Sequence, residues 1–262
     1  MVTDNFPIIH GAAVNCGPNR ISLDGRDIPV EIAVKPIRSS YRLSMSEHGV
    51  RLVIAKSRLH ESADILNRHS KWISGHYEKM RRHVSEIPEI ADGADIPFRG
   101  GKCLLEIVGG NTSACYDGDK ALLQLYVAGN DAENMRNRLC LWYFAQSANF
   151  AKELCLRWNV RERFGARRIV MKDLRTRWGT CNIRNKSITL NWRLIMAPDE
   201  IFEYVLVHEL AHLEVAGHGR DFWNHVEDIL PGSLMKRKWL SKNGFPLLRF
   251  LGDYKLSAER IM

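Results

Sequence analysis

The residues whose types and spacing indicate chemistry lie in the stretch His208-Glu209-Leu210-Ala211-His212. Residues four apart in a helix lie one turn apart on the same face, so both imidazoles can reach one metal ion. Glu209 directly follows the first histidine, where a carboxylate can act as general base on the attacking water. The pattern therefore predicts a helix that supplies two metal ligands and the catalytic base of a hydrolase.

The flanking sequence supports a helix at this position. Pro198 fits the first helical position, and Asp199 and Glu200 in the first turn favour the helix dipole. Gly217 predicts the end of this segment, and 221–230 reads as a second helix that ends before Pro231-Gly232. Apolar residues recur at helical spacing through the motif: Ile201, Phe202, Val205, Leu206, Leu210 and Leu213.

His218 is the favoured third ligand. A catalytic zinc usually has three protein ligands and one open position. Five residues separate His212 from His218, which falls in the predicted turn between the two helices, and imidazole is the commonest metal ligand. Cys181 as a fourth ligand is disfavoured, since it would close the open position. The alternatives for the third ligand are three nearby carboxylates: Glu214, Asp221 and Glu227.

A longer series of residues resembles a known family. It consists of Arg177-Trp178-Gly179-Thr180-Cys181, the segment 188–194, Ala197-Pro198, the segment 204–212, His218 and Phe222-Trp223. This series resembles the YgjP-like metal-dependent hydrolases, which are related to the SprT-like and WLM-type zinc metallopeptidases.

The resemblance is dense from about Arg168 to Trp239 and looser in the N-terminal half. It implies a zincin-type site with Zn²⁺ on His208, His212 and His218, and with Glu209 as catalytic base. Thr180 departs from the serine expected there, but it retains a hydroxyl group.

The expected fold class is α+β. Alternating apolar residues around Asp24-Gly25 predict a hairpin over 20–34, and 41–54 reads as a second hairpin. Helical spacing predicts helices over 62–84 and 132–160. The expected organisation is a strand-rich region over 1–130 and a catalytic domain over 131–262, with one continuous domain as the alternative. The resemblance implies that the second part is zincin-like, of the minigluzincin type, with a small sheet packed on the metal helix.

Composition is that of an ordinary globular chain. Of 262 residues, 45% are hydrophobic and 26% are charged. No apolar run approaches the roughly 18 residues that a membrane span needs, and the N-terminus does not read as a signal peptide. We therefore expect a cytoplasmic protein without membrane contact. The six cysteines form no C-x-x-C pair, which disfavours a zinc finger or a redox dithiol.

The net charge of +8 is concentrated in the half that carries the motif. Residues 151–262 hold 20 of the 38 Lys and Arg but only 13 of the 30 Asp and Glu. A solvated basic face explains this most simply, and an anionic substrate or nucleic acid is the alternative. The sequence does not determine the oligomeric state.

These observations favour a zinc-dependent hydrolase, most of all a metallopeptidase acting on polypeptides. The alternatives are a metal-dependent nucleoside-triphosphate pyrophosphatase, or a basic nucleic-acid-binding module with a structural zinc. Zinc peptidases commonly bind an extended substrate at a sheet edge. The residues expected to line that edge are Arg175, Arg177, Thr180 and Asn191. The candidates for stabilising the oxyanion are Arg177, Tyr204 and His225.

Overall fold

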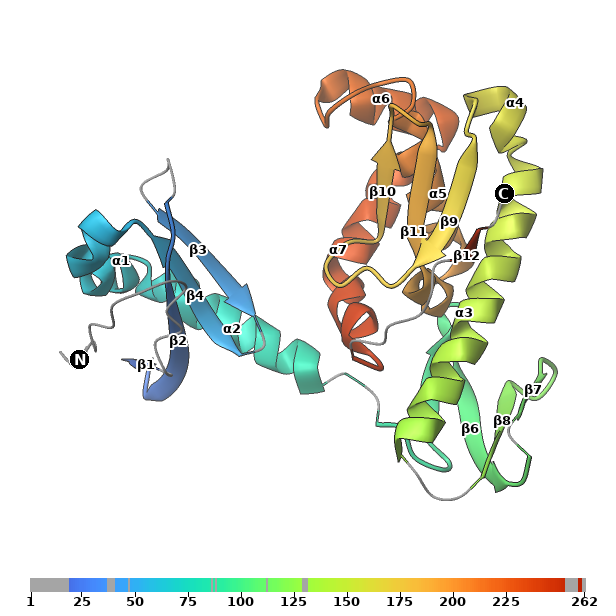
Figure 1. The fold of residues 1–262 in the computed structure, drawn as a ribbon, viewed down its shortest axis with the longest axis horizontal. Helices are drawn as coiled ribbons and strands as arrows, with labels where there is room; N and C mark the ends of the chain where they lie inside the picture. Colours follow the sequence, from blue (N-terminus) through green and yellow to red (C-terminus); the bar gives the residue numbers. More distant parts are fainter. Residues whose placement is uncertain are drawn as a thin grey trace. The chain divides into compact units, whose positions relative to one another are not determined.

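The structure, a computed structural model, describes residues 19–36, 41–46, 48–85, 87, 89–111, 113–128, 132–252 and 259–260. The chain forms two compact units, Met1–Glu86 and Ile87–Met262, each with its own hydrophobic core. Helices and three four-stranded sheets are present among these residues (Figure 1), which confirms the expected α+β class. No helix in the described ranges is long and apolar enough to cross a membrane.

The first unit contains a sheet of strand order β1-β2-β4-β3. Asp24 and Gly25 join β1 to β2 with φ values of 50° and 74°, which a two-residue hairpin turn requires, so the hairpin predicted over 20–34 is confirmed. The hairpin expected over 41–54 is also present as β3 and β4. The strands are β1 (Asn19–Leu23), β2 (Arg26–Val34), β3 (Tyr41–Ser46) and β4 (Gly49–Ile54).

Helices pack on this first sheet and complete its core. The helix predicted over 62–84 is divided in two at His69, whose φ of −100° and ψ of 13° are not helical. The Nε2 atom of His69 lies 2.8 Å from the Tyr41 hydroxyl on β3, so this side chain joins the break to the sheet. The helices are the 3₁₀ helix η1 (Lys56–Glu61), α1 (Ser62–Arg68) and α2 (Ser70–Ser85).

The second unit begins with a sheet of order β5-β6-β8-β7, in which the pairings repeat those of the first sheet. The long helix α3 (Ala132–Arg157) contacts β7, β8 and β9, and thus touches two sheets. It ends earlier than predicted because Asn159 adopts a left-handed conformation with φ of 46°, and the short α4 (Val160–Phe164) follows. The strands are β5 (Asp95–Phe98), β6 (Gly101–Gly109), β7 (Ser113–Asp117) and β8 (Leu122–Val127).

The third sheet lies beside the helix that carries the histidine motif. Its order is β10-β11-β9-β12, so β10 is an edge strand, and both β10 and β11 contact α5. A small sheet therefore packs on the helix that carries the histidine motif, as expected. The elements are β9 (Arg168–Lys172), β10 (Gly179–Asn182), β11 (Ser187–Asn191), β12 (Glu259–Arg260), the 3₁₀ helix η2 (Trp192–Met196), α5 (Asp199–Ala211), α6 (Arg220–Ile229) and α7 (Ser233–Arg249).

The compact units divide after Glu86, whereas the sequence suggested a boundary after residue 130. The reason is a shared core, because buried residues of the β5–β8 sheet pack in the same cluster as those of α3 and α5. The β5–β6 turn also docks on the segment before α5: the Arg99 N–H donates to the Ile195 carbonyl (2.8 Å) and the Gly100 N–H to that of Met196 (3.1 Å). Residues 95–127 thus belong with the unit that contains α5.

Candidate metal centre

Three histidines converge at the end of α5. His208 is in its last turn, His212 caps it one turn later, and His218 lies in the predicted turn before α6. The Nε2 atom of His218 is 3.3 Å from that of His208 and 3.2 Å from that of His212. Among the described residues these three form the one group of His, Cys, Asp or Glu side chains placed to hold a metal ion, with ligand atoms within 4.8 Å of one another.

The spacing of the three nitrogen atoms fits a single ion. Two imidazole nitrogens bound at about 2.0–2.1 Å to a tetrahedral zinc are separated by roughly 3.3 Å. The observed separations of 3.2 and 3.3 Å match this value. The Nδ1 atom of His208 is buried without a hydrogen-bond partner in the part of the chain that the structure describes. Nε2 is therefore the atom of each ring that faces the position of a common metal ion.

The protonation states also suit metal binding, which requires neutral imidazole. Burial, with smaller contributions from His212, His218 and Arg237, lowers the pKa of His208 to about 3. Burial also lowers the pKa of His212. The His212 Nδ1–H donates to the Val215 carbonyl at 3.4 Å, which leaves the Nε2 lone pair available to bind a metal ion.

The carboxylates considered as alternative third ligands lie outside this group. Glu214 pairs with His225 on α6 at 2.8 Å. Glu227 accepts hydrogen bonds from the Ser233 hydroxyl and the Gly232 N–H, which lower its pKa. Cys181 is half-buried on β10, and burial raises the pKa of its thiol to about 11, which disfavours the thiolate that a metal needs.

Glu209 is buried between α5 and the edge strand β10, with 6% of its surface exposed. Burial raises the pKa of its carboxyl group to about 7, and the positive charge of Arg177 opposes this shift. The space for this carboxylate exists because residue 179 is glycine. A Cβ atom at Gly179 would lie 2.7 Å from Glu209 Cγ and Oε1.

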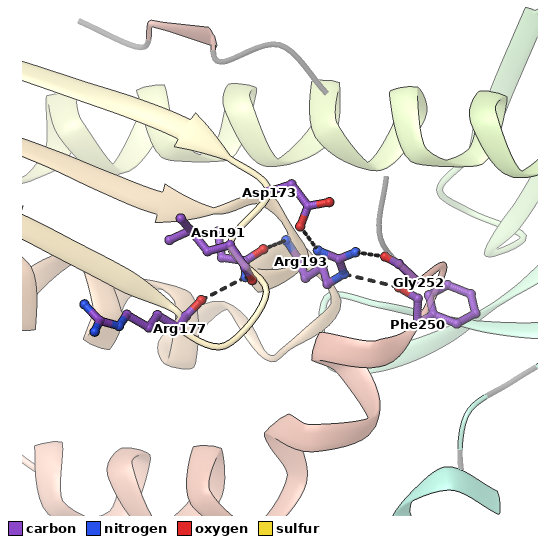
Figure 2. A network of polar contacts seen from close by, with 7 residues as sticks. Asp173, Arg177, Asn191, Arg193, Phe250 and Gly252 are labelled. Carbon is purple, nitrogen blue, oxygen red and sulfur yellow. Dashed lines mark hydrogen bonds and ion pairs between the residues drawn. The ribbon is translucent and has the colours of Figure 1, made fainter. Parts of the chain in front are cut away.

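The four residues expected to line the sheet edge differ in their surroundings. Arg175 and Arg177 are exposed in the loop before β10, and Thr180 is half-buried on β10 itself. Asn191 is fully buried, and its side chain forms hydrogen bonds within the protein (Figure 2). Its Nδ2 donates to the carbonyls of Leu174 (2.6 Å) and Arg177 (2.9 Å). Asn191 therefore has no surface to offer a substrate and instead holds the loop that carries Arg177.

Two candidates for the oxyanion-stabilising group can be compared in their surroundings. Tyr204 lies one turn before His208, with ring centroids 5.9 Å apart. Burial raises its pKa to about 12, so that its hydroxyl stays protonated and can donate. His225 is paired with Glu214, which makes it a contact between α6 and the preceding turn.

The sequence pointed to Trp223 as part of the family resemblance and did not single out Arg237. The Trp223 indole N–H donates to the His218 carbonyl at 2.9 Å, and the Arg237 guanidinium lies over the Trp223 ring, 4.0 Å from its centre. The signal in the sequence for the first contact was a tryptophan five residues after His218. Nothing in the sequence indicated the second, because α7 returns to the site only through the fold.

A Gly179→Ala substitution tests the packing of Glu209. The added methyl group overlaps the carboxylate, so we expect Glu209 to move and kcat for hydrolysis to fall by about 10²-fold, as for a misplacement near 1 Å. Zinc affinity should be unchanged, because the histidines are untouched. The matched control is Gly109→Ala at the end of β6, where an added Cβ meets nothing within 4 Å. Equal activity of both variants would show that the Glu209 position does not matter.

A comparison with protein families agrees with this geometry. A family model described as YgjP-like, metallopeptidase domain, matches residues 39–243, which is most of the chain. Among solved structures, the chain is similar to the crystal structure of the metallopeptidase zymogen of Pyrococcus abyssi abylysin. The identity is 26%, the match covers 32% of this chain and 88% of that chain, and the TM-score is 0.28. No curated protein matches the chain.

Proposed function

The chain belongs to the family of YgjP-like metallopeptidase domains, and on this premise we propose that it is a zinc-dependent metallopeptidase with Glu209 as general base. The observation that carries the proposal is the convergence of three imidazole nitrogens, with Nε2 atoms 3.2 and 3.3 Å apart, at the end of a helix that also carries the buried carboxylate of Glu209, the residue after His208. Three histidine ligands leave one position open, as in catalytic zinc sites. The second unit is then a zincin-like domain of the minigluzincin type.

The proposed mechanism gives each of the site residues a separate role. His208, His212 and His218 would hold the zinc, and Glu209 would take the proton of the attacking water and pass it to the leaving amine. Zinc, when bound, polarises the scissile carbonyl and acidifies water. Glycine at position 179 leaves the space that the Glu209 side chain occupies.

The substrate would lie along β10. Among the described residues this strand is at the edge of its sheet, and it contacts α5 and lies against Glu209 at Gly179, so its outer edge offers backbone groups near the proposed base. An extended polypeptide can add to such an edge through main-chain hydrogen bonds. Arg175, Arg177 and Thr180 are placed in or before this strand, and we assign them to substrate binding. The proposed substrate is therefore an unfolded or extended polypeptide.

Zinc-loaded protein is to be incubated with a reduced and alkylated, permanently unfolded protein, and in parallel with nucleoside triphosphates. The proposal predicts new amino termini from the polypeptide and no pyrophosphate from the triphosphates. Triphosphate cleavage alone would replace the peptidase with a pyrophosphatase. If neither substrate is cleaved while zinc stays bound, nucleic-acid affinity is to be measured against salt concentration. A steep dependence there would indicate a basic binding module with structural zinc.

A further inference from the structure

The three ligand histidines are not held equally. His208 and His212 are fixed by the backbone of α5, and His212 is also held by its contact with the Val215 carbonyl. His218 is the most exposed of the three and lies in a turn. It stands between Gly217, which has φ of 80°, and Gly219, and glycine gives the backbone wide conformational freedom. His218 therefore needs an external constraint to stay at the site.

Trp223, on the first turns of α6, is positioned to supply that constraint. Its indole N–H donates to the His218 backbone carbonyl at 2.9 Å. Its ring centre lies 5.7 Å from that of His218 and 5.6 Å from that of His208. One side chain thus lies against both His218 in the turn and His208 on the helix.

Arg237 connects this side chain to α7. Its guanidinium carbon lies 4.0 Å from the centre of the Trp223 ring, at the distance of a cation–π contact. Arg237 is otherwise exposed, and α7 contributes none of the three histidines. The contact therefore links α7 to the turn of His218 through Trp223.

We propose that Trp223 is a positioning residue that holds His218 in place for the metal, and that Arg237 holds Trp223 from α7. This inference rests on the proposed zinc site. The backbone hydrogen bond restricts the glycine-flanked turn before a metal arrives, so less conformational freedom is lost when it binds. Partners that orient a ligand in this way typically contribute 10–100-fold to metal affinity.

The decisive variant is Trp223→Phe, which keeps an aromatic ring but removes the N–H donor. Zinc affinity is measured by competition with a chromogenic chelator, which does not depend on enzymatic activity. We expect zinc binding to weaken by about 10–100-fold. The matched control is Trp239→Phe on α7, which removes another indole N–H from a ring without contact to the three histidines among the described residues, and whose zinc affinity should equal that of wild type.

A second variant keeps the test independent of folding defects. Arg237→Gln removes the cation from the Trp223 ring at an exposed position; in about 1 M salt, which screens the repulsion between this cation and the metal ion, we expect zinc affinity to fall by roughly 2–5-fold. Thermal unfolding of the metal-free variants shows whether Trp223→Phe is folded. If its unfolding midpoint is lowered, Arg237→Gln decides the question.

The outcomes separate this inference from the proposed function. If wild-type protein binds no zinc, the metal site fails and the role of Trp223 fails with it. If wild type binds zinc and folded Trp223→Phe binds it as tightly, the positioning role is overturned while the zinc site stands. If Trp223→Phe is destabilised and Arg237→Gln binds zinc like wild type, the inference is overturned as well.

Discussion

Replacing Glu209 with glutamine is expected to lower kcat for peptide hydrolysis by about 10²–10⁴-fold, the usual contribution of a general base. Glutamine has nearly the shape of glutamate, so it fits the buried space between α5 and Gly179, but its amide cannot take a proton from water. The histidines are unchanged, so zinc affinity should stay at the wild-type value. Initial rates on an unfolded protein and chelator competition for zinc measure the two effects.

Glu203→Gln is the matched control, because Glu203 is on the same helix and its carboxylate accepts the Trp158 indole N–H at 2.8 Å, away from the histidines. We expect it to retain wild-type kcat. Undiminished hydrolysis by Glu209→Gln would remove Glu209 from the mechanism. Loss of zinc together with activity would instead make its role structural.

Replacing Arg193 with methionine is expected to lower the free energy of unfolding of the second unit by about 3–5 kcal/mol, as for breaking a buried ion pair. Arg193 has 1% of its surface exposed and pairs with Asp173 at 2.5 Å. Its guanidinium also donates to the carbonyls of Phe250 and Gly252 (Figure 2). Methionine has a similar length but no charge and no donors, so the interior position loses its hydrogen bonds to Asp173 and to the two carbonyls.

Urea unfolding followed by tryptophan fluorescence measures this effect, because all tryptophans except Trp72 lie in the second unit. The matched control is Arg99→Met. Arg99 also pairs with an aspartate, Asp199, and lies over the ring of Phe150, but about half of its side chain is exposed. An exposed pair of this kind contributes about 0–1 kcal/mol. Equal losses in both variants would contradict a special role for the buried network.

The grouping of the three histidines could be predicted from the sequence because its geometry is local. The spacing of His208 and His212 places both on one helix face, and Gly217 predicted the chain reversal that returns His218. The hairpin at Asp24-Gly25 was predictable for the same reason, since a two-residue turn with positive φ selects these residues.

Features that depend on distant partners could not be predicted. Asn191 looked like a binding residue, but the carbonyls that it holds belong to Leu174 and Arg177, 17 and 14 residues earlier. The helix break at His69 accompanies a contact with Tyr41, 28 residues away. Local periodicity contains no information about either partner.

The unit boundary has the same explanation. Strands and a helix that alternate along the chain do not reveal which of them share a core. Here the β5–β8 sheet and α5 bury their apolar residues in one cluster. No local pattern in residues 95–127 predicts this shared core.

The most direct test of the zinc peptidase is a titration of metal-stripped protein with zinc while cleavage of an unfolded protein is followed. The three-histidine site predicts negligible cleavage without metal, a linear rise on adding zinc, and a plateau at one equivalent per chain, with His208→Ala inactive throughout. Cleavage that survives stripping, or that His208→Ala performs as well as wild type, would contradict the zinc site of His208, His212 and His218.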